Sequence, residues 1–203
     1  MSRKTRNFDK TRAELVEAAV YLFGRHGYDA VSIEQICRRV DLSRGGFYHH
    51  FSDKRDCFEA AWREVQRTWQ QRMEELIQSG AWASADKWEA VARMLSDVFE
   101  HFADPSVRQI NAVDAPVALG WHRWRELEHE FWQSQNAELL RVLDRRHDPA
   151  LVRIVFDALI DSAMYLAHDD SGEEERRTAV DALVTLIRGL PRLGASSGAE
   201  ASG

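Results

Sequence analysis

The stretch "DLSRGGFYHHF", residues 41–51, combines two adjacent glycines with three aromatic residues and two histidines. On a helix, Phe47 and Phe51 lie four residues apart and share one face, whereas Arg44 and Tyr48 share the opposite face. The stretch therefore predicts a short helix that anchors its phenyl rings in a core and presents polar groups outward.

Two further helical segments precede this stretch. From Asp9 to His26 apolar residues recur at helical spacing, and Gly27 follows as a helix stop. Ser32 followed by Gln35 has the pattern of a capping box, and after a short turn Ser43 can cap the third helix, which is expected to run through residue 51. Two short helices joined by a tight turn, with a helix before them, predict a helix-turn-helix unit.

The rest of the chain also has helical periodicity, and alternating runs of strand length are missing. A long helix is expected to begin at Asp53. Later helices are predicted over Ala85–Ala103, Ser106–Val113, Pro116–Arg146, Ala150–His168 and Glu173–Leu190. The predicted fold class is all-α, with a helix-turn-helix domain over residues 1–52, a larger helical domain over 53–193 and a disordered tail over 194–203.

Composition and charge narrow the class of protein. Of 203 residues, 44% are hydrophobic and 30% charged, which is typical of a soluble globular protein. No apolar run could cross a bilayer, and the N-terminus leads into no secretory signal, so we expect a cytoplasmic protein without membrane partners. Residues 1–55 carry eleven Lys and Arg against seven Asp and Glu, whereas the whole chain has a net charge of −6. This asymmetry indicates a basic N-terminal functional region attached to an acidic remainder of the chain.

The residues "LSRGGFYHHFSDK", 42–54, resemble the recognition-helix signature of the tetracycline-repressor (TetR) family of bacterial regulators. The residues from Ala19 to Ser43 are similar to that family's first two helices, so that the resemblance covers residues 9–60. It implies a DNA-binding transcriptional regulator, in particular a repressor. Such a protein binds a palindromic operator in double-stranded DNA as a homodimer and is released by a small apolar or aromatic effector.

The resemblance also implies which residues contact DNA. They are Ser32, Ser43, Arg44, Gly45, Gly46, Tyr48, His49, His50 and Lys54. Arg44 is expected to reach a guanine edge, while Tyr48 and Lys54 contact phosphates. Many relatives carry a side chain at the position of Gly46 that touches a base, so readout here shifts to Arg44, the backbone of Gly45 and DNA shape. The basic residues of segment 3–6 are expected to form a flexible arm near the DNA.

The later helices are candidates for dimerisation and effector binding. The helix predicted over residues 150–168 is apolar on two sides, so one side can face a second subunit or both can belong to the core. The expected interface consists of Leu151, Val155, Phe156, Leu159, Val180, Leu183, Val184 and Ile187. All seven tryptophans lie outside the DNA-reading part, and aromatic side chains make good pocket walls, although core packing explains each of them as well. The expected effector pocket includes Trp121, His122, Trp124, Phe131, Met164 and Tyr165.

Two other functions stay open. A metal-dependent helical enzyme is disfavoured, because no Glu-x-x-His pair recurs on two helices and no strained nucleophile turn is present. We therefore predict no catalytic residue, no cofactor and no metal ligand. The adjacent His49 and His50 point about 100° apart on a helix, which disfavours a shared metal. The other alternative is a helical protein-interaction module that has lost DNA binding.

Overall fold

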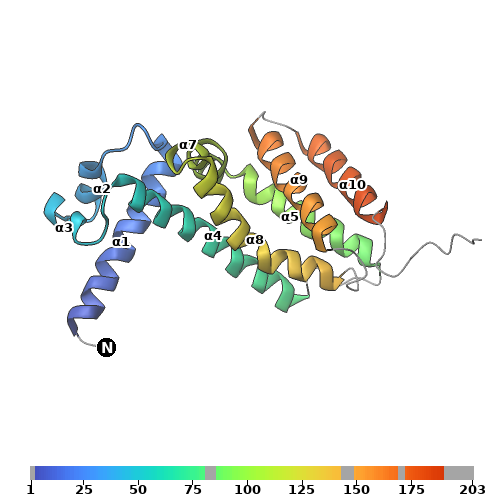
Figure 1. Cartoon of the computed structure of the whole chain (residues 1–203), viewed down its shortest axis with the longest axis horizontal. Coiled ribbons are helices and arrows are strands. Elements are labelled where there is room, and N and C mark those ends of the chain that lie inside the picture. Colours follow the sequence, from blue (N-terminus) through green and yellow to red (C-terminus); the bar gives the residue numbers. More distant parts are fainter. Residues whose placement is uncertain (1–2, 81–85, 143–148, 169–171, 190–203) are drawn as a thin grey trace, which may run out of the picture. The chain divides into compact units, whose positions relative to one another are not determined.

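The computed structural model describes residues 3–80, 86–142, 149–168 and 172–189, and every regular element in these segments is a helix (Figure 1). The predicted all-α class is therefore confirmed for the described residues. The elements are α1 (Arg3–His26), α2 (Ile33–Arg39), α3 (Arg44–Tyr48), α4 (Lys54–Ser79), α5 (Lys87–Ala103), α6 (Pro105–Arg108), the π-helix η1 (Gln109–Asp114), α7 (Ala115–Ala118), α8 (Trp121–Val142), α9 (Pro149–His168) and α10 (Glu173–Gly189). None of the helices in these described segments is long and apolar enough to span a membrane.

The chain divides into two compact units. Unit 1 comprises the described parts of Met1–Ser79 and His101–His129, and unit 2 those of Gly80–Glu100 and Glu130–Gly203. This division runs differently from the predicted domains, which separate α3 from α4 at residue 52. The reason is that α4 packs along α1 and stays with the N-terminal helices.

The sequence prediction is confirmed at the C-terminal end of α1 but differs from the structure at its N-terminal end. The prediction begins this helix at Asp9 and treats segment 3–6 as a flexible arm, whereas α1 begins at Arg3. At the other end the predicted stop is confirmed, because Gly27 adopts a φ of 80° and its N–H donates to the Phe23 carbonyl at 2.9 Å.

The predicted caps of α2 and α3 are also confirmed. Ser32 Oγ accepts from the N–H of Gln35 at 3.2 Å, and Gln35 Oε1 accepts from the N–H of Ser32 at 2.6 Å. Ser43 Oγ accepts from the N–H of Gly46 at 3.1 Å. However, α3 ends at Tyr48 and does not run through Phe51.

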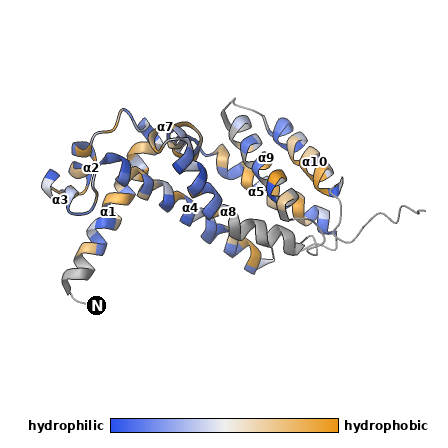
Figure 2. Ribbon diagram, in the orientation of Figure 1, coloured by the Kyte–Doolittle hydropathy of each residue, from blue (hydrophilic) through white to orange (hydrophobic). Residues whose placement is uncertain are grey.

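Phenyl rings anchor α3 in the core of unit 1, as the sequence predicts. Phe47 and Phe51 are fully buried, with ring centroids 5.5 Å apart. Hydrophobic and hydrophilic residues alternate along α1 (Figure 2), which is the pattern of a helix with one buried face. Other fully buried residues in this core are Leu15, Ala19, Phe23, Ile36, Cys57, Phe58 and Trp62.

The segment between α5 and α8 is more broken than predicted. In place of one helix over Ser106–Val113, α6 ends at Arg108 and the π-helix η1 follows. The single helix predicted over Pro116–Arg146 is interrupted at Gly120, which adopts a φ of 83° between α7 and α8. Hydrophobic spacing does not signal a π-helix, and glycine takes a positive φ at little cost.

Asp114, the last residue of η1, holds this segment to the turn after α1. Its Oδ2 accepts from the backbone N–H of Tyr28 at 2.8 Å, and its Oδ1 accepts from Gln109 Nε2 at 3.0 Å. Burial raises the pKa of Asp114, although both donors favour the ionised form. Nearby, a Cβ added to Gly24 would lie 2.7 Å from Ser106 Cβ, so glycine allows α1 and α6 to pack closely.

The core of unit 2 contains buried residues of α5, the later part of α8, α9 and α10, and α9 packs against α10. Five residues expected at the dimer interface belong to this core and are at most 8% exposed: Leu159, Val180, Leu183, Val184 and Ile187. Side chains already buried in their own protomer have little surface left for a second subunit, so their burial does not favour this part of the expected interface. The side chains of Leu151, Val155 and Phe156 lie outside the described residues.

Candidate nucleic-acid interface

The short helix α3 has one buried and one exposed face, as predicted. Phe47 is 0% exposed, whereas Tyr48 is 45% exposed and Arg44 projects into solvent. The turn from α2 includes Asp41, which adopts a φ of 52°. Ser32 and Ser43 are positioned by their capping bonds at the two helix N-termini, where backbone N–H groups favour anions.

The Arg44 guanidinium is held by groups from both helices. Its Nη1 lies 2.7 Å from Glu34 Oε1 on α2, and its Nη2 donates to Tyr48 Oη at 3.4 Å. The hydrogen bond to Tyr48 and the charge of Glu34 both raise the pKa of Arg44, so the group stays charged. Sequence reasoning missed Glu34, because a contact across the turn between two helices has no local signal.

The two adjacent glycines have different surroundings. Gly45 is exposed, and a Cβ added there would meet only Ser43 Oγ at 3.9 Å. A Cβ added to Gly46 would lie 2.7 Å from Cγ and Cδ1 of Leu42. Gly45 therefore leaves the outer surface bare, while Gly46 serves packing within the helix-turn-helix unit.

The remaining candidates for phosphate contact are not equally accessible. His49 is exposed, but the ring of His50 lies 4.2 Å from that of Phe8, centroid to centroid. The His50 Nδ1 is buried, and no described residue forms a hydrogen bond with it. Burial lowers the pKa of His50. The Lys54 ammonium lies 4.1 Å from the centre of the Tyr28 ring at the start of α4.

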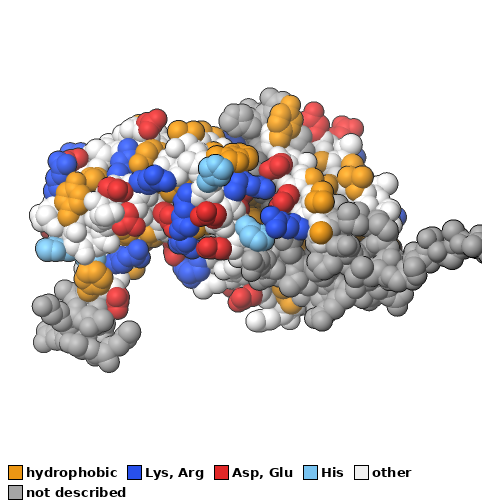
Figure 3. Space-filling view, in the orientation of Figure 1, with side chains coloured by type: hydrophobic (Ala, Val, Ile, Leu, Met, Phe, Trp, Pro, Cys, Tyr) orange, Lys and Arg blue, Asp and Glu red, His pale blue; other side chains and the backbone are white. Residues whose placement is uncertain are grey.

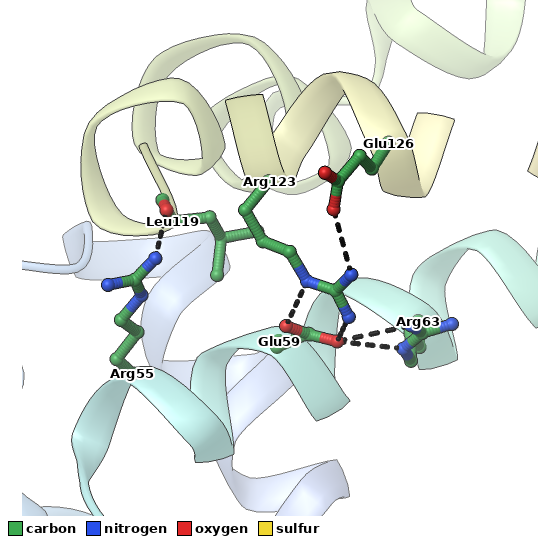
Figure 4. A network of polar contacts seen from close by, with 6 residues as sticks. All are labelled: Arg55, Glu59, Arg63, Leu119, Arg123 and Glu126. Atoms are coloured by element: carbon green, nitrogen blue, oxygen red, sulfur yellow. Dashed lines mark hydrogen bonds and ion pairs between the residues drawn. The ribbon is translucent and has the colours of Figure 1, made fainter. Parts of the chain in front are cut away.

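Polar contacts join the first turns of α4 to α7 and α8 (Figure 4). Arg123 Nε and Nη2 donate to the two carboxylate oxygens of Glu59 at 3.1 and 2.7 Å, and Arg123 Nη1 donates to Glu126 at 3.2 Å. Arg63 contacts the same Glu59 carboxylate at 3.1 Å, and Arg55 donates to a backbone carbonyl at the end of α7. The hydrogen bonds from Arg123, followed by those from Arg63, lower the pKa of Glu59 against the effect of burial. In Figure 3, basic and acidic side chains are interleaved over α4 and the start of α8.

Unit 1 also contains buried polar atoms that are not satisfied. Gln66 Nε2 donates to Asn111 Oδ1 at 3.0 Å, but Gln66 Oε1 and Asn111 Nδ2 have no partner among the described residues. One turn further along α4, the Trp69 ring stacks on His101 at 4.3 Å between centroids, and neither Trp69 Nε1 nor His101 Nε2 has a partner in the described part of the chain. Burial lowers the pKa of His101 to about 4. Sequence reasoning included Trp69 among the tryptophans that could line a pocket, but it missed the buried Gln66 and Asn111, since single polar residues in helices give no signal of burial.

The residues expected to line an effector pocket belong to both units and differ in burial. In unit 1, Trp124 is buried with its ring 5.1 Å from that of Trp121, but the Trp121 and His122 side chains are exposed. In unit 2, Phe131 is buried, while the Tyr165 side chain is exposed. The Met164 side chain lies outside the described residues. Exposed side chains do not line an enclosed site within a protomer, so most of this expectation is not supported by where the residues lie.

The two cysteines, Cys37 and Cys57, are free and buried, and burial raises the pKa of Cys57 to about 12. No group of three or more His, Cys, Asp or Glu side chains in the described segments could hold a metal ion.

An all-α fold with an outward-facing α3 defines a helix-turn-helix protein. A family model described as "Bacterial regulatory proteins, tetR family" matches residues 15–61, and one described as "Tetracyclin repressor-like, C-terminal domain" matches residues 88–190. The second match alone covers more than half of the 203 residues. The chain belongs to the TetR family of bacterial regulatory proteins.

Individual relatives agree with this membership. The Transposon Tn10 TetC protein of Escherichia coli is 25% identical over 130 residues, which is 62% of this chain and 61% of TetC. The HTH-type transcriptional repressor AcnR of Corynebacterium diphtheriae is 42% identical over 53 residues, which is 26% of this chain and 28% of AcnR. The chain thus spans less than two thirds of the length of either relative.

Solved structures show the same fold. A TetR-family transcriptional regulator from Pectobacterium atrosepticum superposes with a TM-score of 0.71 at 24% identity, covering 94% of this chain and 98% of that one. RolR in complex with resorcinol superposes with a TM-score of 0.65 at 17% identity, covering 90% and 89%.

Proposed function

We propose that this chain is a cytoplasmic, DNA-binding transcriptional repressor that binds a palindromic operator as a homodimer. The observation that carries the proposal is the division of α3 into two faces. The Phe47 ring is buried, while Arg44 and Tyr48 face solvent beside Gly45, which has no side chain. A helix presented in this way suits a major groove, in which a guanidinium can donate to guanine N7 and O6. The similarity to the HTH-type transcriptional repressor AcnR, 42% identical over 53 residues, supports the proposal.

Selection of bound duplexes from random DNA tests this function. We expect a palindromic consensus, with half-site centres about 34–36 Å or a multiple of that apart. Affinity should fall steeply with added salt, because Lys and Arg contacts to phosphates release counterions. Lys54→Ala should weaken binding to all duplexes alike. Absence of a consensus together with a flat salt dependence would favour the protein-interaction alternative, and a stoichiometric metal in the purified protein would favour the enzyme alternative.

A small effector is the second part of the proposal, and the unsatisfied polar atoms of unit 1 support it. Gln66, Trp69, His101 and Asn111 offer both donors and acceptors in a buried setting, where a charged ligand would be costly. An uncharged aromatic or apolar molecule with a hydroxyl or amide group fits this chemistry. The structural neighbour RolR was solved with resorcinol, a ligand of that kind.

The route from effector to DNA runs along α4. Five residues separate the end of α3 at Tyr48 from the start of this helix at Lys54. Its early turns are tied to α7 and α8 through Arg55 and Glu59. A ligand acts only through different affinities for two states. If the ligand favours a shifted α4, the two α3 helices of a dimer no longer match one operator.

Titration of resorcinol and related uncharged phenols against an operator complex tests the effector. A phenol that quenches tryptophan fluorescence, and therefore binds the protein, but leaves operator binding unchanged would contradict this route.

A further inference from the structure

An acidic residue lies within the surface that is proposed to meet DNA. Glu34 belongs to the first turn of α2, half of its side chain is exposed, and its Oε1 lies 2.7 Å from Arg44 Nη1. A negative charge on such a surface opposes binding to phosphates. Because Glu34 contacts the guanidinium that is proposed to read a base, we expect a benefit to base reading that offsets this loss of DNA affinity.

The contacts of Arg44 suggest that role. Glu34 accepts from Nη1 and Tyr48 Oη accepts from Nη2, so the guanidinium is supported from α2 and from α3. A guanidinium has more N–H donors than these two contacts use, and the remaining ones suffice for N7 and O6 of a guanine. An Arg side chain loses rotamer freedom when a base fixes it, and support in the free protein removes part of that loss.

Glu34 is itself held in place. The capping box of Ser32 and Gln35 fixes the start of α2, on which Glu34 lies. A hydrogen bond from its own backbone N–H, and also the Arg44 charge and the Ser32 hydroxyl, lower the pKa of Glu34, so the carboxylate is ionised at neutral pH. The support is therefore part of the folded helix pair and is present before DNA arrives.

We propose that Glu34 is a positioning residue for Arg44, so that α2 and α3 together determine how strictly one base pair is read. The inference rests on the proposed DNA-binding function. It differs from a model in which Glu34 merely competes with DNA for the guanidinium. A competing acceptor lowers affinity for the correct base and never sharpens discrimination, whereas a support increases discrimination for the base that fits the held geometry.

The test uses the full-length chain and the duplex obtained by selection. Arg44→Ala identifies the base pair that Arg44 reads, as the position at which this variant loses discrimination. At that position Glu34→Ala should reduce the preference for the correct base about three- to tenfold, against about five- to hundredfold for Arg44→Ala. The double variant should discriminate no less than Arg44→Ala alone. Glu34→Gln, whose amide oxygen can still accept from the guanidinium, should fall between wild type and Glu34→Ala.

A matched control removes the same charge elsewhere in unit 1. Glu14 on α1 is about as exposed as Glu34 and forms an ion pair with Lys10 at 3.5 Å. Glu14→Ala should change affinity for all duplexes by one common factor and leave discrimination at the Arg44 position intact. Thermal unfolding of each variant should match that of the wild type.

Three results separate the outcomes. Tighter operator binding by Glu34→Ala, with discrimination at the Arg44 position unchanged or increased, would overturn the proposal in favour of simple competition. A loss of discrimination at another base pair that persists when Arg44 is also replaced would overturn it in favour of direct base reading by Glu34. A wild-type chain without any sequence preference would overturn the proposed function itself, and this result is known before any Glu34 variant is measured.

Discussion

At the scale of single residues, the adjacent glycines of α3 show that one sequence feature can have two causes. The sequence prediction assigns both Gly45 and Gly46 to the surface that contacts DNA. In the structure only Gly45 borders open space, because the side chain of Leu42 occupies the position that a Cβ on Gly46 would need.

This difference predicts opposite effects of two matched substitutions. Gly45→Ala should stabilise the protein by up to about 1 kcal/mol, because alanine favours helix and meets no close atom. Gly46→Ala gains the same helix preference but forces Leu42 aside at a cost of about 1–3 kcal/mol. Urea unfolding should therefore rank Gly45→Ala above wild type and Gly46→Ala below Gly45→Ala. Equal stabilities of the two variants would show that Leu42 moves freely.

His101 predicts a pH dependence of stability. Burial lowers its pKa to about 4 from 6.5, with Asp104 acting weakly in the opposite sense. As the pH falls below 6.5 the unfolded chain binds a proton that the folded chain does not, so the free energy of unfolding decreases until about pH 4. The loss is at most about 3 kcal/mol, and less because part of the ring is exposed.

His101→Phe keeps a ring stacked on Trp69 and removes the titrating group. Its unfolding free energy should depend less on pH across this interval than that of the wild type, as measured by urea unfolding at several pH values. His26→Gln removes an exposed imidazole and serves as the control. A variant that follows the wild-type pH curve would place the pH dependence elsewhere.

At the scale of elements, the Glu59–Arg123 pair joins two helices that lie far apart in the sequence. Its paired hydrogen bonds make it geometrically better than the Glu59–Arg63 pair within α4. Both pairs are partly exposed, which limits what either contributes.

Double-mutant cycles should separate the two pairs. The coupling free energy between Glu59→Ala and Arg123→Ala should be about 1 kcal/mol, against about 0.3–0.5 kcal/mol for Glu59→Ala and Arg63→Ala. Urea unfolding near neutral pH, where Glu59 is ionised, measures both cycles. A larger coupling for the pair within α4 would mean that the link between α4 and α8 contributes little to stability.

The sequence predicts those elements whose signals are local. The capping box at Ser32, the cap at Ser43 and the glycine stop at residue 27 depend on neighbours in the chain, and all three are found in the structure. The π-helix η1 has no signal in hydrophobic spacing, and helical spacing continues on both sides of Gly120, so the sequence prediction contains neither the π-helix nor the break. The candidate site divides in the same way: the two faces of α3 follow from helical spacing, whereas the Glu34–Arg44 pair and the buried Gln66–Asn111 pair arise only when separate helices meet.

At the scale of the whole molecule, one α3 helix reads too few bases to select an operator, so the proposed function requires two copies. Of the residues first expected at the interface, the five whose side chains the structure describes are buried within unit 2. The large apolar side chains of α9 and α10 that are exposed in the described segments are Ile154, Tyr165 and Leu186, at 62%, 70% and 58%. Exposed apolar groups on two packed helices are typical of a surface that a second subunit covers.

Leu186→Lys should therefore separate the subunits. Lysine suits the last turn of α10, where it favours the helix dipole, so the protomer should remain folded while a buried charge opposes the dimer. Sedimentation equilibrium should show a shift from dimer to monomer at micromolar protein, and operator binding should weaken more than binding to random DNA, because only the operator needs two reading helices at fixed separation. Val117→Lys places the same charge at a similarly exposed position on α7 and should remain dimeric. A dimer that persists in Leu186→Lys would move the interface to another surface, whereas a wild-type monomer would contradict the homodimer itself.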